Sequence, residues 1–395
     1  MTSMRWTFGM RMAAAAVCSL AAGAILCLAW GEAAVRYGRP QGFSGVSSGT
    51  NGWRLPVNAG TYERLAELEI EQDSEFAQAL WQEAARRNPR SSRAWTALGL
   101  AAERREHFVE AEGDFLRAAH VDRQYLPAWT LANFYFRRGD PQNFWPWARR
   151  AAARCYGDLT PLIKLCDLMA PGVLAGLGDS AAIDRVYLDL LIHESRLDDA
   201  QRVARRLLAR AARDDVTRLM AFTSLQIDAG HADAARQIWG GLFPATSGSI
   251  VTNGGFRVPP TGDGFDWKIR ATRGVRSQWR DSGIQFLLGG GQPETCILLE
   301  QPLELEVRRY RLRFEYSLST RDGRFSGLHW AIQSVAFSAL ESPQFDGTGS
   351  STDATWAFGV PRRGLARLSL FYRREPGSAS PELKVELQEV RIEPL

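Results

Sequence analysis

The sequence predicts a multidomain α + β protein in which a solenoid of helical repeats is followed by an antiparallel β-sandwich, with one transmembrane helix before both. Three observations lead to this prediction. Apolar residues recur with helical spacing up to about position 243 and with a period of two after about position 251. An uncharged stretch lies near the amino terminus. The length of 395 residues, with 45% hydrophobic and 23% charged residues, is sufficient for two or three domains with cores of their own.

The amino-terminal stretch predicts a membrane anchor. Residues 12–30 carry no charge, and a helix of that length spans about 28 Å, close to the roughly 30 Å of the bilayer core. A cleaved signal peptide is the alternative, because small residues follow directly. Arg5 and Arg11 favour a cytoplasmic head, although two arginines beyond the stretch weaken that asymmetry. We expect residues 1–38 to form a signal anchor of the inner membrane, with the bulk of this single-pass chain in the periplasm.

Composition excludes some partners. The net charge of +4 is mild, and without a block of basic residues we expect no nucleic-acid partner. Lysine occurs only at Lys164, Lys268 and Lys384, so 45 of the 48 basic residues are arginine, which indicates a GC-rich bacterial genome. Five cysteines are too few for a disulfide framework. Cys155 and Cys166 are close enough in sequence to bond in a periplasm or to remain as two buried thiols.

A helical repeat follows a Gly/Ser-rich tether at residues 39–57. Within residues 58–243, a small residue recurs at an interval of 34, with a bulky residue four positions later on the same helix face. Gly139 and Gly230 precede new helical stretches and predict turns. The residues that we expect to pack the repeats are Ala77, Trp81, Ala84, Trp95, Leu98, Gly99, Ala111, Phe115, Ala118, Trp129, Ala200 and Ala234.

This pattern resembles the tetratricopeptide repeat (TPR) family. Residues 92–125 match its order of Trp, Leu-Gly, Ala, Phe and Ala well, and residues 58–91 match in their second half only. Residues 126–159 keep Trp129 but have Trp145 in place of a small residue, and residues 181–242 keep little beyond the alanines. The resemblance implies stacked helix pairs with a partner protein on their concave face. A non-repetitive helical bundle is the alternative.

The period changes to two after a linker at residues 244–250. Residues 310–318 alternate cleanly between apolar and polar, as a half-buried antiparallel strand does. Residues 328–335, 355–360, 366–373 and 382–395 have similar patterns, and a phase slip at Gln388–Glu389 predicts a bulge in the last of them. Residues 251–395 are therefore expected to form a β-sandwich.

The stretch NGGFRVPPTGDGFDW, residues 253–267, opens this module. Its Asn-Gly-x-Phe turn, together with EVRIEP near the carboxyl terminus, resembles carbohydrate-binding modules and galactose-binding-like jelly rolls. The resemblance implies that Phe256 anchors the first strand. It also implies an acidic residue beside a structural calcium, but Arg257 stands at that position, and only Glu389 falls near an acidic position of the closing strand. We therefore expect no metal ion and no cofactor.

A sugar site needs an exposed aromatic ring and a few directed polar groups. The candidate glycan-binding residues are Trp267, Trp279, Arg276, Arg280, Asp281 and Gln333. Trp330 and Trp356 lie inside strand patterns and are expected in the core. A sandwich that only packs or docks proteins is the alternative.

No catalytic motif is present, and no catalytic residue is predicted. The neighbouring carboxylates Asp198–Asp199 and Asp214–Asp215 lie at expected helix ends, where they favour the helix dipole. The sequence thus predicts a non-enzymatic, membrane-anchored scaffold of the bacterial envelope, with repeats that dock a protein and a sandwich that binds a glycan, in exopolysaccharide or surface-polysaccharide assembly. The alternative is an assembly adaptor whose sandwich binds no sugar.

Overall fold

A computed structural model describes residues 58–69, 74–172, 175–210, 212–244, 248–281, 283–320, 326–345 and 349–395. The predicted anchor at residues 12–30 and the predicted tether at 39–57 lie outside these ranges. Within them, no helix is both long enough and apolar enough to cross a membrane.

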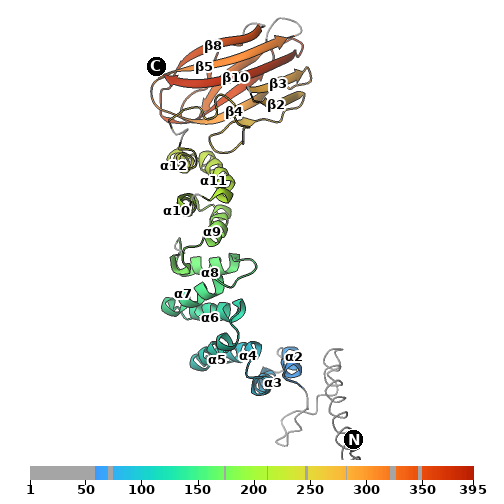
Figure 1. Ribbon diagram of the computed structural model, residues 1–395, viewed down its shortest axis with the longest axis vertical. Helices are drawn as coiled ribbons and strands as arrows, with labels where there is room; N and C mark the ends of the chain where they lie inside the picture. The colour runs from blue at the N-terminus through green and yellow to red at the C-terminus, as the bar shows by residue number, and fades with distance from the viewer. Residues whose placement is uncertain are drawn as a thin grey trace, which may run out of the picture. The chain divides into compact units, whose positions relative to one another are not determined.

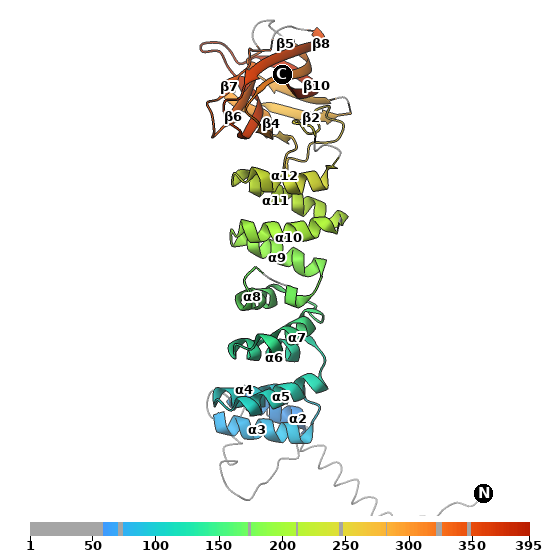
Figure 2. The same ribbon diagram turned by 90° about the vertical axis from the view of Figure 1, so that its left-hand side faces the viewer.

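Helices come first and strands second in the described chain, which confirms the predicted order (Figure 1). The helices are α2 (Ala59–Glu69), α3 (Ser74–Arg87), α4 (Ser92–Arg104), α5 (Phe108–Val121), α6 (Tyr125–Arg137), α7 (Pro141–Ala152), α8 (Thr160–Met169), α9 (Ala181–His193), α10 (Leu197–Ala209), α11 (Val216–Asp228) and α12 (Ala232–Leu242), with short 3₁₀ helices at Ala175–Leu177 and Arg213–Asp215. Consecutive helices form hairpins, among them α4 with α5 and α11 with α12 (Figure 2).

Four of the described hairpins share one turn geometry. A residue with positive φ follows the first helix at Glu106, Gly139, Ser195 and Gly230. The next backbone N–H then reaches back to a carbonyl five residues earlier, as from His107 to Ala102 at 3.0 Å. This is the Schellman ending of a helix, which glycine favours because it has no Cβ. The turns predicted at the two glycines are confirmed, whereas Glu106 and Ser195 form the same turn without glycine.

These turns correct the repeat length. Gly139 follows Glu106 by 33 residues, and Gly230 follows Ser195 by 35. The alanine that corresponds to Ala200 is therefore Ala235, which is fully buried, and not the predicted Ala234, which is only partly buried. The predicted interval of 34 residues therefore misplaces a packing residue where one repeat is 33 residues long and another is 35.

Size complementarity holds the first complete hairpin together. Ala111 and Phe115 of α5 are buried, and a Cβ on Gly99 of α4 would lie 2.6 Å from the Phe115 ring. Glycine is thus the residue that lets the two helices approach. The other predicted packing residues Ala77, Trp81, Ala84, Leu98, Ala118 and Ala200 are also buried, whereas Trp95 and Trp129 are half-buried.

The sandwich consists of two antiparallel five-stranded sheets. Sheet A has the order β1-β4-β9-β6-β7 and sheet B the order β2-β3-β10-β5-β8. The strands are β1 (Lys268–Ile269), β2 (Val275–Arg280), β3 (Gly283–Gly289), β4 (Thr295–Leu305), β5 (Arg309–Thr320), β6 (Leu328–Ser334), β7 (Leu340–Glu341), β8 (Gly349–Gly359), β9 (Gly364–Arg373) and β10 (Glu382–Pro394).

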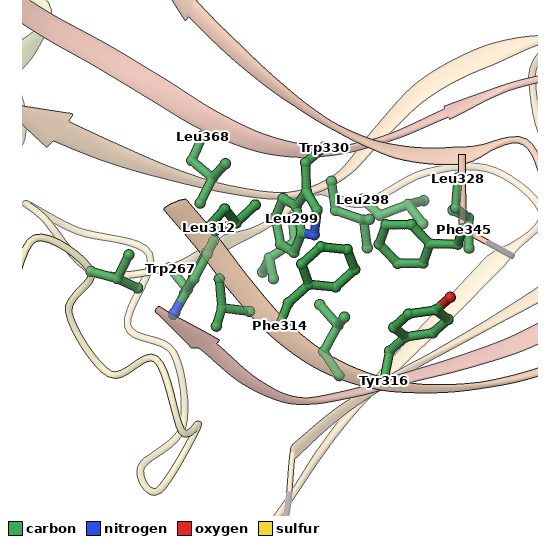
Figure 3. Packing of buried hydrophobic residues seen from close by; sticks show 14 of the residues in the cluster. Trp267, Leu298, Leu299, Leu312, Phe314, Tyr316, Leu328, Trp330, Phe345 and Leu368 are labelled. Atoms are coloured by element: carbon green, nitrogen blue, oxygen red, sulfur yellow. The ribbon is translucent and has the colours of Figure 1, made fainter. Parts of the chain in front are cut away.

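The core lies between the two sheets (Figure 3). Leu312 and Phe314 of β5 face Leu368 of β9 and Trp330 of β6, and the Phe314 and Trp330 rings meet edge to face at 5.9 Å between centroids. All four side chains are at most 6% exposed, so this apolar contact stabilises the sandwich.

The five predicted strands are present, and the bulge is confirmed, because the pairing of β10 with β5 shifts between Leu387 and Glu389. The pattern did not reveal β2, β3 and β4. In β4 the central residues Leu298–Gln301 are buried on both faces, which removes the alternation that marks a half-buried strand.

The chain divides into two compact units, one ending at Val186 and one running from Tyr187 to Leu395. The second unit contains both α11–α12 and the sandwich.

Candidate binding surfaces

The stretch from Asn253 to Trp267 is a structured entry to the sandwich. Phe256 is fully buried against the Trp267 ring at 5.6 Å, although its own φ is positive at 50°. The Asn253 side chain holds the loop by bonding the backbone of Val258, and the Trp267 indole N–H donates to the carbonyl of Asn253 at 3.2 Å. Phe256 thus has the anchoring role that the family resemblance implied.

The same contacts correct one predicted sugar residue. Trp267 is 0% exposed and packs on Phe256 and Trp330, so its ring is not available to a ligand. Trp279 of β2 is half-buried against the core, and its indole N–H donates to the Phe256 carbonyl at 2.7 Å. Both tryptophans therefore support the sandwich, Trp267 from inside the core and Trp279 through its hydrogen bond to the Phe256 carbonyl.

The predicted polar residues do not form one cluster. Arg276 and Arg280 lie on the outer face of β2, on the opposite side from Trp279, because successive side chains of a strand alternate. Asp281 is exposed where β2 turns into β3. Gln333 is exposed on β6 of sheet A, the other layer of the sandwich.

Sheet B instead has an open groove of about 790 Å³ on its outer face. One row of this groove consists of cross-strand neighbours, namely Arg276, Leu287, Lys384 and Ser319. Glu382 adjoins this row. Neither Arg276 nor Lys384 has a carboxylate at ion-pair distance among the described residues, and no aromatic residue lines the groove there. The groove therefore offers two cations, hydroxyls and the Glu382 carboxylate to a hydrated ligand. Sequence reasoning found Arg276 but missed Lys384, because only the sheet pairing brings the two together.

An apolar cluster joins the last helix hairpin to the sandwich. Phe265 is 1% exposed and meets the Trp239 ring of α12 edge to face at 6.1 Å, with Met220, Ile227 and Ala235 around it. Gly264 is required beside them, because its φ is +58° and a Cβ there would lie 2.3 Å from the Trp239 ring. We call this contact, with the ion pairs described next, the hairpin–sandwich joint.

Polar contacts surround the joint. The Gly264 N–H donates to Ser224 Oγ of α11 at 2.7 Å. Arg236 of α12 stacks over the Phe265 ring at 4.0 Å and pairs with Glu304 of β4 at 3.4 Å, and burial lowers its pKa. Around the rim, Arg363 pairs with Asp233 and Glu304, and Arg367 pairs with Asp228. The residues of sheet A in these pairs face outward, so the hairpin covers part of the outer face of sheet A.

Side chains that could react or bind a metal ion are dispersed over the described chain. Cys155, Cys166 and Cys296 are free thiols, and burial raises the pKa of Cys166 to about 12. His329 is buried on β6 against Phe371, where burial lowers its pKa. Within the described ranges, no three His, Cys, Asp or Glu side chains are grouped so as to hold a metal ion.

No protein-family profile matches the chain, and no curated protein matches it. Among solved structures, the sandwich is similar to TmCBM61 in complex with beta-1,4-galactotriose, with 12% identity, a TM-score of 0.26, and 37% of this chain and 99% of that chain covered. The helices are similar to YrrB, a TPR protein with an unusual peptide-binding site, with 15% identity, a TM-score of 0.27, and 47% of this chain and 86% of that chain covered. They are also similar to Pseudomonas aeruginosa pilF, with 15% identity, a TM-score of 0.29, and 49% of this chain and 93% of that chain covered. Each likeness covers less than half of this chain.

Proposed function

We propose that this protein is a non-catalytic binding scaffold of the bacterial envelope, anchored in the inner membrane through residues 12–30. The helical repeats dock a partner protein, and the sandwich is a second binding module held in fixed orientation by the last hairpin. The observation that carries this proposal is the hairpin–sandwich joint. It covers part of sheet A while the outer face of sheet B, with its groove, stays accessible.

A fixed joint is the property that a scaffold needs. A buried aromatic pair surrounded by ion pairs orders both sides, so that a ligand on sheet B keeps one orientation toward α11 and α12. A flexible tether between two independent binding domains would need none of these contacts.

Affinity purification of the tagged full-length protein from envelope membranes tests the scaffold role. We expect a partner protein that is retained at physiological salt, and retention that does not depend on the sheet B groove. A full-length protein that retains no protein from its own envelope would contradict the scaffold role.

Glycan binding is the second candidate function, and the groove on sheet B favours it. Because no aromatic side chain lines the groove among the described residues, the ligand it suits is an acidic polysaccharide held by ion pairs and hydrogen bonds with Arg276, Lys384 and Ser319. Affinity electrophoresis of the full-length protein in acidic and neutral polysaccharides, including those of its own cell surface, provides the test. Retention that is lost in Arg276→Ala/Lys384→Ala supports sugar binding, and unretarded migration in every polysaccharide favours the adaptor without sugar.

A further inference from the structure

We propose that a groove along α5 and α7 binds an acidic segment of the partner protein in which carboxylates alternate with apolar side chains. The inference rests on the proposed docking function of the repeats and specifies the chemistry of the partner. The groove consists of two open hollows of about 450 Å³ each, which share Leu116 and His120 as lining residues. We call it the arginine groove, because Arg117, Arg123, Arg150 and Arg154 line it.

Two guanidinium groups of the groove are held on indole rings. Arg117 lies over the Trp95 ring at 5.0 Å, and Arg150 lies over the Trp147 ring at 4.2 Å. The Trp95 ring is itself held, because its N–H donates to the Pro89 carbonyl at 2.9 Å. A stacked guanidinium loses little further side-chain entropy when it binds a planar anion.

Among the described residues, only one of the four arginines has an acidic partner. Arg117 pairs with Asp114 at 3.0 Å, but Arg123, Arg150 and Arg154 have no carboxylate at ion-pair distance in the described chain. Other helical arginines do have an acidic partner. The Arg137 guanidinium, for example, pairs with Glu103 of the neighbouring hairpin at 2.7 Å. The groove therefore carries an uncompensated positive charge that a carboxylate-bearing ligand would complement.

The lining also specifies the class of ligand. A guanidinium already occupies one face of each of the two indoles, so that face is not open to a sugar or a base. The floor between the arginines is apolar, with Leu116 41% exposed and Val121 and Pro89 beside it. An extended peptide with acidic and apolar side chains meets both features, whereas a lipid headgroup or a free phosphate would use only the charges.

Fluorescence anisotropy of the full-length protein in detergent tests the proposal. The probe is a labelled twelve-residue peptide of alternating Glu and Leu, and the matched peptide has Lys in place of Glu. Arg123→Ala/Arg150→Ala/Arg154→Ala should weaken binding of the acidic peptide about 30-fold or more, as expected for three partly exposed charged contacts. The control variant Arg64→Ala/Arg104→Ala/Arg205→Ala removes the same charge from exposed helix positions outside the groove and should bind as the parent does.

Four outcomes would overturn the inference: equal loss in both triple variants, no loss in either, no binding of the acidic peptide by the parent, or preferential binding of phosphatidylglycerol vesicles or inorganic phosphate. These outcomes can be separated from failure of the docking function. If the groove variant still retains the partner protein from envelope membranes, the repeats dock a protein elsewhere. If the unaltered protein retains none, docking itself is refuted.

Discussion

Replacing Phe265 with alanine should release the last hairpin from the sandwich and leave both folded. The ring is 1% exposed and belongs to the small cluster with Met220, Ile227, Ala235 and Trp239, not to the cluster between the two sheets. Its loss should therefore weaken the hairpin–sandwich joint and spare the core around Trp330.

The expected magnitude follows from the contacts that disappear. Truncating a buried Phe to Ala costs about 3–5 kcal/mol through lost transfer energy and the cavity left behind. That range already includes the edge contact with Trp239 at 6.1 Å and the Arg236 guanidinium at 4.0 Å, so we expect about 4 kcal/mol. A loss of this size corresponds to about a 1,000-fold change in an opening equilibrium.

Native-state hydrogen exchange resolves the two sides of the joint. Amide protection in α11 and α12 should fall by up to this factor in Phe265→Ala, while protection in β5 and β10 changes little. Val258→Ala, at a 55% exposed position of the same loop, is the matched control and should change stability by less than about 0.5 kcal/mol. The reasoning is refuted if β5 and β10 lose as much protection as the hairpin, or if the hairpin loses less than tenfold.

Three further predictions concern the helical repeats. Gly99→Ala should lower the free energy of unfolding measured in urea by about 1–3 kcal/mol, because the added methyl would lie 2.6 Å from the Phe115 ring. In the double variant, Phe115→Leu should recover part of this loss. A double variant whose loss equals the sum of the two single losses would contradict this explanation. Hydrogen bonds from Arg86 and Arg87 lower the pKa of Glu83 from 4.5 to about 2, so Glu83→Gln should cost about 1 kcal/mol at pH 7 after solvent screening. A lowered carboxylate pKa stabilises the fold above pH 4.5, so the difference between parent and variant should vanish as the pH falls from 5 to 2, and a difference that persists at pH 2 would exclude the ion-pair origin. With a pKa of about 12, the Cys166 thiol should react with a thiol reagent at pH 8 only after unfolding, and reaction of the native protein at Cys166 would show that the site opens.

Local patterns determined much of the fold. The alternation over residues 310–318 identified β5, and the phase slip near Glu389 identified the bulge of β10, because both arise from the two-residue period of a strand. Gly139 and Gly230 marked helix turns because their positive φ is costly for other residues. The repeat of small and bulky residues likewise identified the pairing of α4 with α5, which depends on complementary sizes at a short sequence distance.

Tertiary structure decided which surfaces are available to ligands. Trp267 matches a sugar platform by residue type, but Phe256 and Trp330 enclose it, from positions that the sequence does not mark as its neighbours. The grouping of Arg276 with Lys384, and of Phe265 with Trp239, depends on long-range pairing between strands and helices. Residue type and spacing therefore determined most helices and the alternating strands, whereas burial and the meeting of distant segments determined the candidate sites, because these depend on contacts that no local period encodes.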